Sequence, residues 1–116
     1  TSIWLVYRIM ANTYKNAKVD LTTTGATTVL TTPVGSTNII KSILASEDSG
    51  NADTITLTIT DTDSAVFSLF KVKAVGANTT VELLTQPLVL QDSEILKATA
   101  ATANRLHLVV SYLEIS

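Results

Sequence analysis

The sequence contains no cysteine, so neither a disulfide bond nor a thiolate metal site is available. Charged residues make up only 16% of the chain, with a net charge of -2, and the lysines and arginines are scattered rather than clustered. A nucleic-acid-binding protein would need a basic patch. The longest apolar run, the opening TSIWLVYRIM, has half of the roughly 20 residues that a membrane span requires. We therefore expect no nucleic-acid partner and no membrane partner.

Catalytic motifs are also missing from the sequence. The single histidine, His107, has no acidic or serine motif near it in sequence, which favours a structural role over that of a catalytic base or metal ligand. The glycines at 25, 35, 50 and 76 fit neither a dinucleotide fingerprint nor a phosphate-binding loop, and no GxSxG nucleophile elbow occurs. We predict no catalytic residues, no cofactor and no enzymatic activity.

Several carboxylates around TITLTIT could in principle supply oxygen ligands to calcium: Asp61 and Asp63, with Glu47, Asp48 and Asp53. They lack the spacing of an EF-hand loop, and turns capped by aspartate explain them more simply. The sequence therefore predicts no metal site. The NTT at Asn78 matches a glycosylation sequon, but an asparagine in a turn is the simpler interpretation.

Strand patterns dominate the rest of the chain. In TITLTIT, the aliphatic Ile55, Leu57 and Ile59 alternate with threonines, which is typical of a strand with one buried face. SEDSGNAD before it and DTDS after it are turn sequences. Similar patterns predict further strands near residues 18–23, 27–32, 38–45, 65–73, 79–84, 94–100 and 105–115.

Strands at intervals of roughly ten residues are typical of an antiparallel sandwich or barrel. We predict an all-β, antiparallel β-sandwich of about eight strands in residues 16–116, either jelly-roll or immunoglobulin-like, after an extended N-terminal arm in residues 1–15. Pro87 interrupts one apolar run, because proline cannot donate to a strand ladder. SEILKATAATA, with a capping-box-like Ser93, leaves a helical alternative open.

The opening segment is apolar on both sides. As a strand, it would place Ile3, Leu5, Tyr7 and Ile9 on one face and Trp4 and Val6 on the other. An exposed strand of this kind pairs with another chain or aggregates. The last strand, RLHLVVSYLEI, is likewise apolar on much of both faces, so it should lie centrally in a sheet or under a neighbouring subunit. The residues predicted to form an interface are Ile3, Trp4, Leu5, Val6, Tyr7, Ile9, Leu113 and Ile115.

Two arrangements of the arm remain open: it adds a strand to a neighbouring subunit, or it folds back as an edge strand on its own sandwich.

Four stretches carry a resemblance to known proteins: YKNAKVDLTTT, TTPVGSTNIIKSI, TVELLTQPLVL and the closing SYLEI. Over residues 10–116 the chain resembles small virion proteins of tailed bacteriophages, especially phages of aquatic bacteria. This resemblance implies a β-sandwich structural component, either a capsid decoration (cement) protein or a part of the neck, tail or fibre. It implies no active-site residues. Relatives tend to begin at the position of Met10.

From the resemblance we expect a homo-oligomer, with a trimer the best guess because such proteins commonly occupy three-fold positions. The partners would be further copies and the major capsid protein. The protein would lie on the particle exterior after synthesis in the host bacterial cytoplasm. A receptor- or glycan-binding role would need exposed aromatic platforms, whereas Trp4 is the single tryptophan and Tyr14 and Tyr112 are isolated.

Overall fold

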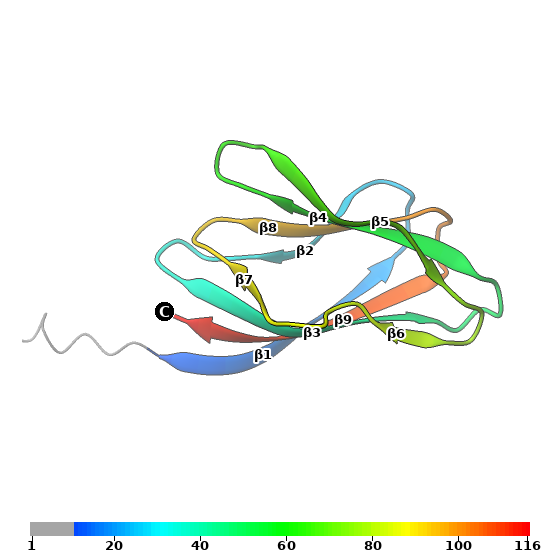
Figure 1. The fold of residues 1–116 in the computed structure, drawn as a ribbon, viewed down its shortest axis with the longest axis horizontal. Coiled ribbons are helices and arrows are strands. Elements are labelled where there is room, and N and C mark those ends of the chain that lie inside the picture. Colours follow the sequence, from blue (N-terminus) through cyan, green and yellow to red (C-terminus); the bar gives the residue numbers. More distant parts are fainter. Residues whose placement is uncertain (1–10) are drawn as a thin grey trace, which may run out of the picture.

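Two antiparallel sheets pack face to face in the computed structural model, which describes residues 11–116 (Figure 1). Alternating aliphatic and polar residues produce this arrangement, since each strand has one side to bury. The described part contains only strands and turns as regular structure. The nine strands are β1 (Asn12–Leu21), β2 (Thr27–Thr31), β3 (Thr37–Glu47), β4 (Asp53–Thr60), β5 (Val66–Val75), β6 (Thr80–Glu82), β7 (Leu88–Leu90), β8 (Ile95–Ala100) and β9 (Leu106–Ile115).

The strand order identifies the type of sandwich. The first sheet has the order β1-β9-β3-β6, with β7 also paired to β3, and the second has the order β2-β8-β4-β5. Because β6 and β7 pair with different parts of β3, they lie end to end and share one strand position. Eight strand positions whose sequence neighbours alternate between two sheets in this way form a jelly roll. The prediction of an all-β antiparallel sandwich is confirmed, and the jelly-roll alternative is the one observed.

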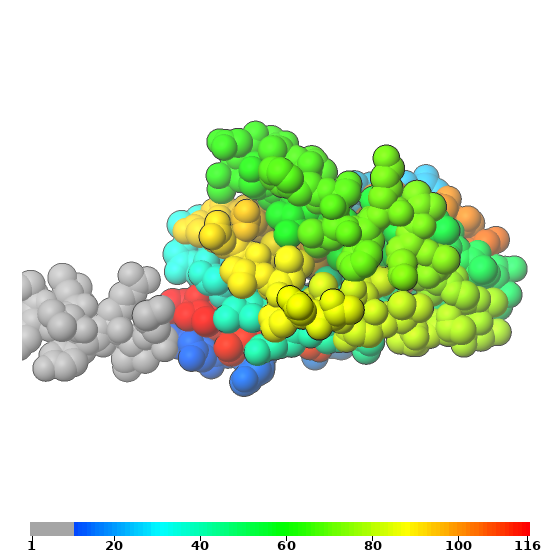
Figure 2. Space-filling model, viewed as in Figure 1, coloured from blue at the N-terminus to red at the C-terminus, as the bar shows by residue number. Residues whose placement is uncertain are grey.

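The edges of the sandwich differ from one another. β1 and β2 contact each other on one side, while β5 lies at the end of the second sheet on the other side. In Figure 2, green β5 lies beside the yellow segment that contains β7. The last strand, β9, lies between β1 and β3, which confirms the central position predicted from its two apolar faces.

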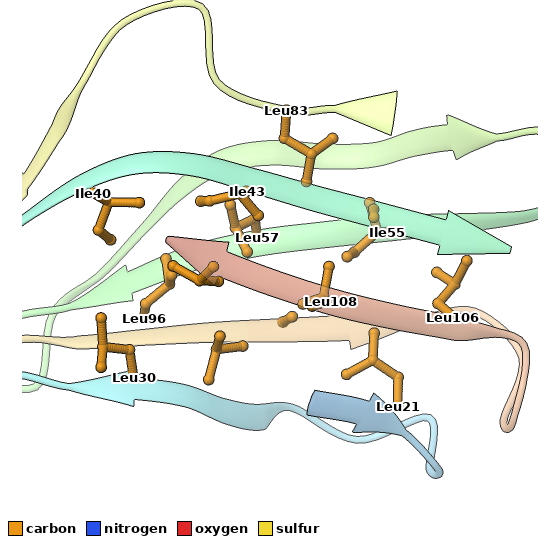
Figure 3. Packing of buried hydrophobic residues seen from close by; sticks show 14 of the residues in the cluster. Leu21, Leu30, Ile40, Ile43, Ile55, Leu57, Leu83, Leu96, Leu106 and Leu108 are labelled. Atoms are coloured by element: carbon orange, nitrogen blue, oxygen red, sulfur yellow. The ribbon is translucent and has the colours of Figure 1, made fainter. Parts of the chain in front are cut away.

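The core lies between the two sheets and is almost entirely aliphatic. In β4, Ile55 and Leu57 are fully buried, whereas the threonines between them are half-buried on the opposite face. Figure 3 shows leucines and isoleucines of both sheets pointing toward one another, among them Leu96 and Leu108. These side chains fill the space between the sheets.

Three local features differ from the sequence-based expectations or resolve them. β1 begins at Asn12, so residues 12–15, which we assigned to the arm, form the start of the first sheet. The apolar run after Pro87 forms the separate three-residue strand β7. The helical alternative after Ser93 is wrong: Ser93 lies in a turn with φ 65°, and β8 follows it. No helix of the described chain is long and apolar enough to cross a membrane.

Candidate functional site

The histidine predicted to be structural bridges two aspartates. His107 on β9 is the register partner of Asp20 on β1, and its Nδ1 is hydrogen-bonded to the Asp20 carboxylate. Its Nε2 lies 3.1 Å from Oδ1 of Asp48 in the β3–β4 turn. The hydrogen bond to Asp20 raises the pKa of His107, burial opposes this effect, and Asp48 adds to it. With both ring nitrogens engaged, His107 joins β1, β9 and a turn.

The carboxylate of Glu47 holds two turns together. Glu47 is only 1% exposed, and it accepts backbone N–H groups of Ser49 (2.8 Å), Gly50 (2.9 Å) and Asn51 (3.0 Å) in its own turn. It also accepts the N–H of Asn78, at 3.2 Å, from the β5–β6 turn. Burial alone would raise the pKa of Glu47, but these hydrogen bonds and that from the Ser49 hydroxyl lower it to about 2. Glu47 is therefore an ionised structural residue rather than a free ligand.

The other carboxylates considered as calcium ligands are also engaged in turns. Oδ1 of Asp61 accepts the N–H groups of Asp63 and Ala65, both at 2.9 Å, as an aspartate-capped turn does. Asp53 accepts the N–H of Thr102 at 3.1 Å. Within residues 11–116, no group of three or more His, Cys, Asp or Glu side chains is arranged to hold a metal ion.

The predicted interface residues fall in two places. Six of them, Ile3, Trp4, Leu5, Val6, Tyr7 and Ile9, lie outside the described residues. Leu113 and Ile115 lie on β9, both half-buried. Their neighbours Tyr112 and Val110 are buried in the core, so alternation places Leu113 and Ile115 on the outer face of the first sheet.

Leu113 belongs to an apolar row that crosses the first sheet. Its register partners are Tyr14 on β1 and Ile39 on β3, and Ile39 in turn pairs with Val89 on β7. Tyr14 is 77% exposed and Val89 is 49% exposed, while the two middle side chains are half-buried. We call Tyr14, Leu113, Ile39 and Val89 the outer apolar row. Sequence reasoning found Leu113 but not the others, because only the register brings them together.

A shallow hollow of about 380 Å³ adjoins the outer apolar row. Tyr14, Lys15 and Lys41 contribute to its lining. Lys15 also forms an ion pair with Glu114, with 3.1 Å between Nζ and Oε2. The hollow thus combines one exposed aromatic ring with two cationic side chains.

A second apolar surface lies where β5 faces the segment that joins β6 to β7. Leu69 and Phe70 of β5 and Leu84, Pro87 and Leu88 of the facing segment line a hollow of about 220 Å³. We call this hollow the β5 seam; it lies between the green and yellow regions of Figure 2. The sequence gives no signal for it, since residues 69–70 and 83–88 come together only through the sandwich topology.

Comparisons with known proteins give one structural neighbour. No family model and no curated protein matches the chain. Among solved structures, the chain is similar to the cyanophage Pam1 capsid asymmetric unit, with 19% sequence identity and a TM-score of 0.44. The match covers 91% of this chain and 85% of that chain.

Proposed function

We propose that this protein is a non-enzymatic structural component of a bacteriophage virion, and specifically a decoration (cement) protein on the exterior of the head. In this function it stabilises the shell through contacts between subunits. The observation that carries the proposal is the outer apolar row, which leaves apolar side chains of four strands at the surface. The sequence resemblance to phage virion proteins supports the same function.

The outer apolar row has the properties of an interface. Tyr14 and Val89 at its ends are well exposed, and contiguous exposed apolar surface in a soluble protein is typical of interaction sites. The side chains are fixed on paired strands, so little conformational entropy is lost when a partner covers them. Tyr14 adds an aromatic group of the kind enriched at interfaces.

The filled core directs function to the outside of the molecule. Jelly-roll domains occur in viral capsids, lectins and cupins. Here leucines and isoleucines such as Ile43, Leu57 and Leu108 fill the space between the sheets (Figure 3). Binding partners would therefore meet the outer face or the edges of the sandwich.

The partners in this proposal are further copies of the chain and the major capsid protein. A homotrimer would suit a three-fold position on a head, since cyclic symmetry closes the contacts without open-ended polymerisation. The protein would be synthesised in the host bacterial cytoplasm and then join the particle exterior.

A binding experiment with undecorated heads tests the proposal. Labelled protein should co-sediment with the heads and saturate at a simple fraction of the number of capsid subunits. Val89→Asp places a charge in the outer apolar row, so it should greatly weaken binding. Val34→Asp is the matched control, because Val34 is an exposed loop valine, 85% accessible, outside the row. Absence of binding by the unmodified chain, or equal binding by both variants, would contradict the proposal.

A neck, tail or fibre component that binds a host receptor or glycan is the alternative. The hollow beside Tyr14, with Lys15 and Lys41, favours it, because an exposed ring can stack on a sugar and lysines can bind its polar groups. A panel of host surface glycans tests this alternative. Binding that disappears with Tyr14→Ala, without binding to heads, would support it over decoration.

A further inference from the structure

β5 is an edge strand that combines length with apolar exposure. It has ten residues, and on one side it pairs with β4, while no strand of residues 11–116 pairs with its other side. Val66 is 62% exposed and Phe67 is 57% exposed. The first half of the strand, VFSLF, carries no charge; Lys71 and Lys73 come only in the second half. Soluble proteins normally protect such an edge with charge, proline or a covering segment.

The core is incompletely covered beside this edge. Phe67 pairs in register with Ile59, which packs against the core, yet more than half of Phe67 is exposed. Leu69 and Phe70 pack against the core but stay half-buried, and they line the β5 seam. At about 220 Å³, the seam is smaller than the roughly 300–1,000 Å³ of small-molecule sites. Its size and apolar lining suit a few inserted side chains.

The other outer strands are poorer acceptors of a strand. β1 carries Lys15, Lys18 and Asp20 and is polar along most of its length. β2 has only five residues and contacts β1. β5 is therefore the free edge where an additional strand would find both main-chain partners and apolar cover.

We propose that residues 2–9 of a second copy of this chain add as a strand to the free edge of β5 and place alternate apolar side chains in the β5 seam. Main-chain hydrogen bonds would give affinity, and the side chains in the seam would fix the register, as in other cases of strand addition. The inference rests on the self-association in the proposed function and names its donor and acceptor surfaces.

The sequence of the donor segment fits this edge. Residues 2–9 carry one charge, Arg8, and have apolar side chains on both faces of a strand. A strand at the edge of β5 would have one face toward the seam and the other beside Val66 on the outer side of the sheet. A segment with two apolar faces benefits from a site that offers apolar contact on both.

The direction of the chain at Ala11 favours a donor from another copy. The carbonyl of Ala11 accepts the N–H of Ser116 at 3.1 Å, so the backbone is still in line with β1 where the described chain begins. Reversal directly before Asn12 would need a tight turn, and Ile9, Met10 and Ala11 are poor residues for one.

The distance to be crossed leads to the same conclusion. β1 and β5 lie at diagonally opposite edges of the sandwich (Figure 1). A donor from the same chain would cross about three strand spacings of 4.8 Å and one sheet spacing of about 10 Å. Ten extended residues reach about 33 Å. Crossing would use about half of that reach, whereas a donor from a second copy keeps its full length for pairing.

Because the chain has no cysteine, engineered cysteines can test the proposal directly. Full-length Leu5→Cys is mixed with full-length Phe67→Cys and oxidised gently. The matched mixture contains Leu5→Cys and Tyr14→Cys, since Tyr14 is an exposed aromatic residue on the opposite edge. We expect at least ~10-fold more disulfide-linked heterodimer in the first mixture, because docking raises the effective concentration of the two thiols.

Two results would overturn the inference. One is equal or greater linkage to Tyr14→Cys. The other is that the double variant Leu5→Cys/Phe67→Cys links only within one chain, as a monomer on a non-reducing gel. Binding of the unmodified chain to heads is measured separately. Binding without linkage at β5 would leave the proposed function intact, and linkage without binding would leave only the strand addition.

Discussion

At the scale of single residues, Glu47 is the side chain whose charge the fold depends on most directly. Its carboxylate accepts N–H groups from two turns, and its pKa is lowered to about 2 from 4.5. A lowered pKa in the folded state contributes stability above the unfolded pKa, and that contribution is lost as the pH falls through the folded pKa. The relevant window is therefore from about pH 4.5 down to about pH 2.

Glu47→Gln should lower the urea midpoint of unfolding at about pH 7, because an uncharged side chain accepts these N–H groups less strongly. The difference from the unmodified protein should shrink as the pH approaches 2, where Glu47 is itself protonated. Glu114→Gln serves as the control, since Glu114 makes a single ion pair with the partly exposed Lys15. A difference that is constant between pH 7 and pH 2.5 would contradict this account.

His107 has the opposite pH dependence. Its pKa is raised by Asp20 and further by Asp48. The stability that it contributes is fully present below the unfolded pKa of about 6.5 and is lost as the pH rises through the higher folded pKa.

Since His107 is the only histidine, its imidazole signals can be titrated by NMR without assignment problems. We expect a pKa above 6.5 in the unmodified protein and a lower pKa in Asp20→Asn. Asp63→Asn, which changes an aspartate in the β4–β5 turn, should leave the pKa of His107 unchanged. An equal pKa in all three proteins would show that the contact between His107 and Asp20 has no electrostatic effect in solution.

At the scale of elements, β4 supplies two of the fully buried side chains that join the sheets. Leu57→Ala should cost about 2–5 kcal/mol in the free energy of unfolding, because the fully buried leucine leaves a cavity. Leu44→Ala, at a leucine 37% exposed on the outer face, should change it by less than about 1 kcal/mol. Urea unfolding of both variants measures the difference, and equal losses would place the core elsewhere.

Edge strand β5 contains a strained position. Val72 has φ 54°, a conformation that β-branched residues avoid and asparagine tolerates. Val72→Asn should therefore raise the free energy of unfolding by about 1 kcal/mol. Val66→Asn, an exposed valine of the same strand with negative φ, should give no gain. Thermal unfolding of the two variants is the measurement, and a loss with Val72→Asn equal to that with Val66→Asn would be evidence against strain.

The elements show why some parts of the structure could be predicted and others could not. β4 and β9 were predictable, because burial of one or both faces is written in the order of their aliphatic residues. The first half of β1 was not, since NTYKNA is polar on both sides and is a strand because it pairs with β9. β7 has only three residues and depends on its pairing with β3.

The candidate surfaces follow the same rule. Leu113 and Ile115 were predictable from the apolar pattern of the last strand. The outer apolar row and the β5 seam depend on strand order and register, which one sequence does not specify. The six interface residues between Ile3 and Ile9 stay a prediction, because they lie outside the described residues.

At the scale of the whole molecule, the filled jelly-roll core and the apolar outer surfaces belong to one account. The core makes the sandwich rigid, so the outer apolar row on one sheet and the β5 edge on the other have fixed relative positions. A small protein with two such surfaces can contact further copies through one and a shell through the other. Decoration of a head requires both kinds of contact.

The number of copies in purified virions tests the central claim most directly. Quantitative mass spectrometry would compare peptides of this protein with those of the major capsid protein in the phage that encodes it. The account predicts one copy per capsid subunit or a simple lattice fraction of that number. A few copies per particle would instead indicate the neck, tail or fibre, and absence from the particle would contradict a virion role altogether.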